Sequence, residues 1–184
     1  MKINCSYIPP EIITAQGYTV SRVWPTKVGS KGRNLLPANC CPYSRAFLSE
    51  VIGESEKVIM ANSCDTMRRV YDAQINKSYF LQVPRLTNKI NINFYKEKLK
   101  EIKNILAQNN KSQEKNLKKE IEEFNELRKL LKKLRDKIIE NYRISFLTLI
   151  DVLKNDYYKK DKKKIKEVIN SIEKDSLAIN KNSL

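Results

Sequence analysis

Residues 57–72 read KVIMANSCDTMRRVYD, and this run predicts a strand followed at once by a helix. Residues 58–60 are Val, Ile and Met between polar neighbours, which is typical of a fully buried strand in a parallel sheet. The polar residues 62–65 follow, and the apolar positions 67, 70 and 71 then recur at helical spacing. A strand that leads directly into a helix is the unit from which α/β folds are built.

The same alternation of strand and helix extends over the first half of the chain. Further strands are predicted at residues 2–7, 18–24 and 79–83. Helices are predicted from Pro10 to Gly17 and from Pro42 to Gly53. The segment 25–39 carries two prolines and two glycines and is predicted to be a loop. This order of elements favours a parallel sheet with crossover helices.

The composition changes near residue 90, and from Phe94 onward the chain has no glycine or proline. Apolar residues that step by three or four predict one face of a long helix: Leu117, Ile121, Phe124, Leu127, Leu131, Leu134 and Ile138. Breaks are predicted at residues 109–112 and near Asn155-Asp156, before a last helix over 165–172. The apolar face could form a coiled coil, although its short length favours packing within its own domain. We therefore predict two parts of the chain, an α/β domain over residues 1–91 and a helical part over residues 92–184.

The chain has a formal net charge of +15, which raises the question of nucleic acid. Acidic and basic residues are interspersed in most of the helical half, so solvated lysines are favoured over a nucleic-acid surface. The one dense run, residues 159–164, could bind phosphate but is expected to be a solvated helix start. No stretch is long and apolar enough for a membrane span, and no signal peptide is recognised at the amino terminus. The expected location is the cytoplasm.

The four cysteines are Cys5, Cys40, Cys41 and Cys64, and the chain has no histidine. In the cytoplasm these thiols would be reduced, and metal chemistry would run on thiolates or carboxylates. Cys41 precedes a predicted helix, and Cys64 lies between a predicted strand and a helix, so both are expected at the carboxyl edge of the sheet. Thiolates at helix starts could bind an iron–sulfur cluster. The spacing is not specific, and buried cysteines that act as small hydrophobic residues are the alternative.

Four segments, in order along the chain, resemble the 2-hydroxyacyl-CoA dehydratase and benzoyl-CoA reductase family. Ala61–Asp72 closely resembles a segment of the D-component type, as does Tyr79–Arg85. Cys41–Arg45 is similar to the first cluster-cysteine motif of the family, and Cys5–Ile13 with Gly17 looks like its opening strand and helix. The helical run to about Leu153 is similar in pattern, so the resemblance covers roughly residues 1–155.

This resemblance implies a Rossmann-like (flavodoxin-like) αβα domain over residues 1–91, followed by a helical elaboration and a basic helical tail. It implies an iron–sulfur cluster of the 4Fe-4S type, held by Cys41 and Cys64 and by a third cysteine from a second, similar domain. Members receive a low-potential electron from an ATP-hydrolysing activator and use it for radical dehydration or reduction of an acyl-CoA. The adjacent Cys40-Cys41 pair looks like the double-cubane branch, in which Cys40 and Cys5 would be additional ligands.

The departures from the family pattern limit what the resemblance implies. A full member is about twice as long, so the second domain is expected to be absent or supplied by a partner polypeptide. Gln82 stands where an acidic residue is commoner, and no catalytic residue can be named. Two functions follow: a cluster-binding subunit of a dehydratase or reductase, or a truncated, cluster-free protein whose basic helices bind a partner. In the first case Cys41 and Cys64 should lie close together, with Cys40 nearby.

Overall fold

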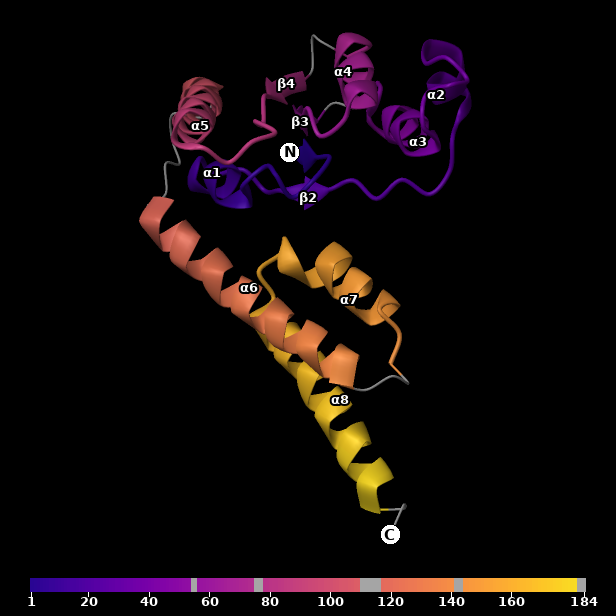
Figure 1. The fold of residues 1–184 in the computed structure, drawn as a ribbon, viewed down its shortest axis with the longest axis vertical. Helices are drawn as coiled ribbons and strands as arrows, with labels where there is room; N and C mark the ends of the chain where they lie inside the picture. Colours follow the sequence, from indigo (N-terminus) through magenta and orange to yellow (C-terminus); the bar gives the residue numbers. More distant parts are fainter. Residues whose placement is uncertain (54–55, 75–77, 110–116, 141–143, 182–184) are drawn as a thin grey trace. The chain divides into compact units, whose positions relative to one another are not determined.

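The computed structural model describes residues 1–53, 56–74, 78–109, 117–140 and 144–181, and the side chains among them as far as residue 174. The chain forms two compact units, Met1–Lys115 and Asn116–Leu184 (Figure 1). The first unit holds the sheet, and the second is entirely helical over its described residues. The predicted break at residues 109–112 lies, from residue 110 on, outside the described residues.

Four strands form a parallel sheet in the order β2-β1-β3-β4. The strands are β1 (Lys2–Ile3), β2 (Ser21–Arg22), β3 (Val58–Ala61) and β4 (Ser78–Leu81). Ile3 of β1 pairs with Arg22 on one side and with Ile59 on the other. All four lie within or beside the predicted strands, and the predicted α/β fold with a parallel sheet and a long helical segment is confirmed.

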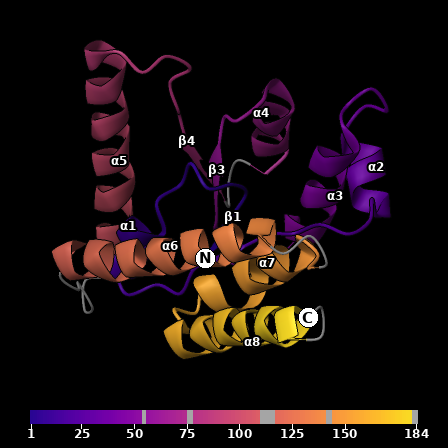
Figure 2. The same ribbon diagram turned by 60° about the horizontal axis from the view of Figure 1, so that its bottom comes forward.

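Helices cover both faces of this sheet. The helices of the first unit are α1 (Pro10–Ala15), α2 (Ser30–Leu35), α3 (Pro42–Val51), α4 (Asp65–Asp72) and α5 (Lys89–Asn109). Figures 1 and 2 show α1 and α5 on one side of the sheet and α3 and α4 on the other, with α2 beside α3. Gly17 has a φ of 77°, the left-handed conformation that ends a helix and that glycine adopts without strain.

The prediction that residues 25–39 are a loop was wrong, because α2 forms inside this segment. Contacts from α3 supply the reason. The Ser49 hydroxyl accepts hydrogen bonds from the N–H groups of Gly29 and Gly32, each at 3.0 Å. A Cβ atom on Gly32 would lie 1.9 Å from the carbonyl oxygen of Arg45, so only glycine allows the two helices to approach this closely. The helix thus depends on tertiary contacts that local sequence does not reveal.

The core on the α3 and α4 side of the sheet is apolar and fully packed. Val58 and Met60 of β3 lie in it, and because side chains alternate along a strand, the equally buried Ile59 and Ala61 point to the opposite face. Both faces of β3 are therefore covered, as its continuous apolar run predicts. The helices and the loop before α3 add the remaining members: Val23, Leu36, Cys40, Phe47, Leu48, Val51, Met67 and Val70.

The side chain of Asn4 continues the sheet beyond the end of β1. Its amide nitrogen donates to the carbonyl oxygen of Ala61 at 3.1 Å, and its amide oxygen accepts from the Ala61 N–H at 3.0 Å. Asn62 has a similar role at the next strand, where its side-chain oxygen accepts from the N–H of Val83 at 2.6 Å. Asn4 is 2% exposed, so its two hydrogen bonds are shielded from water. These two asparagines hold together the segments that leave β1, β3 and β4.

The second unit contains α6 (Leu117–Glu140), α7 (Leu147–Val152), a π-helical turn η2 (Leu153–Tyr157) and α8 (Lys162–Lys181). The apolar face of α6 packs within this unit, on α8 and α7, around a core built from Phe124, Leu127, Leu134, Ile138, Val152, Tyr157, Ile165, Ile169 and Ile172. The break predicted near Asn155-Asp156 comes later in the chain: η2 continues α7, and the chain turns at Lys160, whose φ is 60°.

One position of the predicted apolar face was wrong. Ile121 is 41% exposed, whereas its neighbour Glu120 is only 4% exposed. The reason is an ionic cluster: the ammonium group of Lys160 forms ion pairs with Glu120 and Glu123, the latter at 2.8 Å, and lies over the ring of Phe124. The buried acid is therefore compensated by a cation from the turn before α8.

The lysine-rich run at residues 159–164 is largely neutralised within its own unit. Lys162 pairs with Glu126, and Lys164 pairs with the buried Asp156 at 3.2 Å. Together with the Lys160 pairs, these contacts favour a structural role for the run over a phosphate site. No helix among the described residues is long and apolar enough to cross a membrane.

We predict that Asn4→Ala lowers the free energy of unfolding of the first unit by about 2–4 kcal/mol, because both backbone groups of Ala61 lose their partners in a buried place. Urea denaturation followed by fluorescence of the single tryptophan, Trp24, measures this loss. The exposed Asn34→Ala is the matched control. An Asn4→Ala variant as stable as this control would contradict the role given to Asn4.

The Lys160 cluster predicts a loss of stability at alkaline pH. Burial lowers the pKa of Lys160, but hydrogen bonds and attraction from Glu120 and Glu123 outweigh it, and the net pKa lies above the ordinary 10.5. The charged lysine therefore stabilises the folded state fully below pH 10.5, and this contribution disappears as the pH rises through the higher pKa of the folded state. Helix unfolding by urea, measured by circular dichroism from pH 8 to pH 11.5, should show this loss in the wild type and a smaller one in Lys160→Gln. The exposed Lys132→Gln should behave as the wild type, and an equal alkaline loss in Lys160→Gln would contradict the assignment.

Candidate metal centre

The carboxyl edge of the sheet brings together three segments that carry cysteines. Cys5 follows β1 by two residues, Cys64 is the residue directly before α4, and Cys41 is the residue directly before α3. The strand order reverses between β1 and β3, and in open parallel sheets ligands bind in the crevice at such a point, outside the carboxyl ends of the strands. Cys5 and Cys64 lie in the segments that follow β1 and β3, the two strands that border this crevice.

Hydrogen bonds tie the start of α3 to this edge. The hydroxyl of Tyr43 donates to the carbonyl oxygen of Asn4 at 3.1 Å, and its ring stacks on Phe47 with centroids 6.3 Å apart. The Cys41 thiol interacts with the hydroxyl of Thr66, and the Cys5 thiol interacts with the hydroxyl of Ser63. Each of these two thiols therefore meets a hydroxyl from the segment that contains Cys64.

The surroundings of Cys41 favour the thiolate. The thiol is exposed, and its sulfur lies 2.9 Å from the hydroxyl oxygen of Ser44 and 3.4 Å from the Ser44 nitrogen, which donates to it. Partial burial raises the pKa of Cys41, but the hydrogen bonds from Ser44, from the Thr66 hydroxyl and from the N–H of Tyr43 outweigh it and lower the net pKa. Unpaired N–H groups at the first turn of a helix generally stabilise a thiolate in this way.

The other cysteines differ in exposure. Cys64 is exposed at the start of α4. Cys5 is half-buried, and burial raises the pKa of its thiol despite opposing contributions from the Tyr7 N–H and the positive charge of Arg22. Cys40 is 9% exposed and lies in the apolar core cluster. Thus, of the four cysteines, only Cys41 and Cys64 present exposed thiols at helix starts. It stays a prediction that these two bind one cluster, with Cys40 and Cys5 as further ligands.

The residues present fit part of a thiolate-bound metal site. Two exposed thiols come from different segments, and hydrogen bonds lower the pKa of one of them, Cys41, which favours the thiolate that binds metal. Among the described residues, no three His, Cys, Asp or Glu side chains come close enough to hold a metal ion together.

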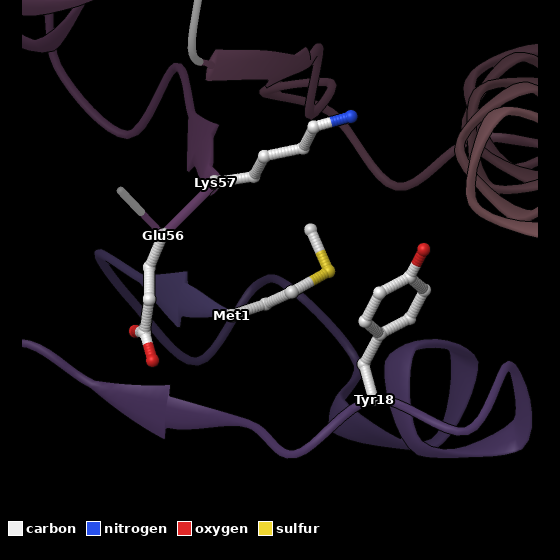
Figure 3. Close-up of a pocket in the computed structure, with 4 residues that line it drawn as sticks. All are labelled: Met1, Tyr18, Glu56 and Lys57. Carbon is white, nitrogen blue, oxygen red and sulfur yellow. The ribbon is translucent and has the colours of Figure 1, made fainter. Parts of the chain in front are cut away.

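A pocket opens at the amino-terminal edge of the sheet. Figure 3 shows its lining by Met1, Tyr18, Glu56 and Lys57, with the Met1 side chain between Lys57 and Tyr18. The Met1 ammonium group donates to the carbonyl oxygen of Thr19 at 2.7 Å, which anchors the start of the chain. All four residues precede strands, so this pocket is at the opposite edge from the cysteines.

A family model described as 2-hydroxyglutaryl-CoA dehydratase, D-component, matches residues 5–183. The chain belongs to this family. The match contains all four cysteines and continues through α8, so it extends beyond the residues 1–155 that the sequence motifs predict. A search of the curated proteins found none that matches. Membership makes this chain a dehydratase-type subunit and implies a partner, such as an activator or another subunit.

The cysteines of this D-component-family chain can be named as candidate ligands from the sequence, but the residues around Cys41 cannot. Ser44 and Thr66 contact the Cys41 sulfur, and Asn4 and Tyr43 fix its segment to the sheet. The sequence did contain one indication of Ser44. It stands three residues after Cys41, and the side chain of the residue before a helix commonly accepts a hydrogen bond from the N–H at that position. No local pattern indicates that Thr66 reaches Cys41, because that contact joins two helices.

We predict that Ser44→Ala raises the pKa of Cys41, because the thiolate loses its shortest hydrogen bond. Alkylation of Cys41 by iodoacetamide, followed by peptide mass spectrometry across pH, should give a wild-type midpoint below the ordinary value of 9.0 and a higher midpoint in the variant. Thr66→Val should act in the same direction. The exposed Ser30→Ala is the matched control, and a midpoint in Ser44→Ala equal to this control would refute the assignment.

Proposed function

We propose that this chain is the iron–sulfur-binding component of an enzyme of the 2-hydroxyacyl-CoA dehydratase and benzoyl-CoA reductase type, acting in the cytoplasm. It would accept a low-potential electron from an ATP-dependent activator protein for the dehydration or reduction of an acyl-CoA. Family membership supports the dehydratase type. The observation that carries the cluster proposal is the placement of Cys41 and Cys64 at the starts of α3 and α4, at the carboxyl edge of the sheet.

Each part of this edge has a task in the proposal. Cys41 and Cys64 would hold the cluster, which would supply one-electron chemistry at low potential. Ser44 and Thr66 lower the pKa of Cys41 and so favour its thiolate form. Asn4 and Tyr43 keep the start of α3 beside the ends of β1 and β3, so that the ligands need little rearrangement to bind. A double-cubane cluster would require Cys40 as well, and that thiol would have to leave the apolar core.

The number of cluster ligands is the reason to propose a partner polypeptide. Iron–sulfur clusters of this class take about four ligands, whereas the described residues bring no group of three suitable side chains together. We infer that another polypeptide segment completes the ligand set and covers the exposed edge. The isolated chain should therefore hold a cluster weakly, or only with a small thiol in place of the missing ligands.

The test is anaerobic reconstitution with iron, sulfide and a small thiol, followed by absorbance and iron content. Cys41→Ala and Cys64→Ala should each lose most of the cluster absorbance, because each removes one exposed ligand. Cys5→Ala should lose less, since its thiol is half-buried. Cys40→Ala should lose absorbance only if the cluster is a double cubane, and circular dichroism checks that this core variant still folds.

The outcomes separate the candidate functions. Full absorbance in both Cys41→Ala and Cys64→Ala would show that the ligands are assigned wrongly. A wild-type chain that stays colourless with free thiols, with and without a co-expressed partner, would favour a cluster-free protein that binds its partner through basic helices. Strongly salt-dependent binding to DNA or RNA would point to nucleic acid instead.

A further inference from the structure

Arg22 stands at the same edge of the sheet as the cysteines. It is the last residue of β2 and pairs in register with Ile3 of β1, two residues before Cys5. The N–H of Val23 donates to the carbonyl oxygen of Ile3, which fixes the end of β2 beside the end of β1. The guanidinium group interacts with both the Cys5 thiol and the Tyr43 hydroxyl. Tyr43 in turn stands two residues after Cys41 in the chain.

The charge of Arg22 is held in place without being neutralised. Its guanidinium carbon lies 4.3 Å from the centre of the Trp24 ring, a cation–π contact that limits its motion. The Nε atom is buried and has no hydrogen-bond partner, and no carboxylate pairs with Arg22 in the described part of the chain. This differs from the second unit, where Lys160, Lys162 and Lys164 each pair with an acid.

A half-buried cation is stabilised by a nearby anion, because partial burial weakens its solvation by water. A thiolate-bound iron–sulfur cluster is such an anion, and each electron added makes it more negative. Net charge, hydrogen bonds to sulfur and solvent exposure set the reduction potential of these clusters. A fixed positive charge within about ten ångströms of a cluster interacts strongly with it where burial reduces screening by water and salt.

We propose that Arg22 is the fixed positive charge of this site and that it stabilises the reduced form of the bound cluster. The inference rests on the proposed function, since it requires a cluster at this edge. Arg22 would act on the cluster through its charge and is not expected to bind iron. Removing the charge should make reduction harder and should also weaken retention of the cluster.

The experiment compares wild type, Arg22→Gln and Arg22→Lys after anaerobic reconstitution with iron, sulfide and a small thiol. The readouts are the midpoint potential, from a redox titration followed by absorbance and electron paramagnetic resonance, and the iron retained after dilution. Arg22→Gln should shift the potential to more negative values and lose iron several-fold faster. Arg22→Lys keeps the charge and should restore most of both. Arg33→Gln, on the exposed side of α2, removes the same charge and should leave the potential unchanged.

The outcomes distinguish the two proposals. Clusters in wild type and Arg22→Gln with equal potentials would overturn the role of Arg22 and leave the proposed function intact. Loss of the cluster in both Arg22→Gln and Arg22→Lys, with Trp24 fluorescence unchanged, would show that the shape of the side chain matters and its charge does not. Loss in Arg22→Gln alone, with retention in Arg22→Lys, would support the proposal. A wild-type chain that forms no cluster, with and without a co-expressed partner, would overturn the proposed function and this inference together.

Discussion

The two hydrogen bonds between the Asn4 side chain and the backbone of Ala61 are the interaction on which the rest of the first unit depends. β1 and β2 have only two residues each, so their ladders contribute few backbone hydrogen bonds. The amide of Asn4 adds one more pair, buried and geometrically specific, at the point where the strand order reverses. Tyr43 then attaches α3 to the carbonyl oxygen of the same residue. The segments that carry Cys5, Cys41 and Cys64 are therefore all attached to this one residue.

Much of this architecture could be predicted from the sequence, because it follows from periodicity and from residues that end helices. The run from Val58 to Ala61 predicts a buried strand, Pro42 predicts the start of α3, and Gly17 predicts the end of α1. What could not be predicted depends on distant partners. α2 forms through contacts of Gly29 and Gly32 with Ser49, seventeen or more residues away. Glu120 is buried in place of Ile121 because Lys160, forty residues later, supplies the opposite charge.

The candidate site divides in the same way. Cysteines are visible in any sequence, and their positions before predicted helices indicate chemistry at the sheet edge. The residues that interact with them are two serines, a threonine and an arginine, and these interactions appear only when the segments meet in the fold. The two units also use charge differently. The second unit neutralises its dense lysine run internally, whereas the first leaves Arg22 without a carboxylate among its described residues. A net charge of +15 is therefore a poor guide to where positive charge acts.

The close contact at Gly32 has a consequence for how genetic data on this chain should be interpreted. Gly32 carries no functional group, yet any side chain there would collide with the backbone of α3 at Arg45. Substitutions would push apart α2 and the helix that begins directly after Cys41, and so they would disturb the candidate site from a distance. In a mutational scan this glycine would rank with the cysteines that the proposed function makes ligands. Such a screen would separate the two kinds of position only if it recorded protein abundance alongside activity, because Gly32 variants would lose both, whereas variants of the proposed ligands would lose activity alone.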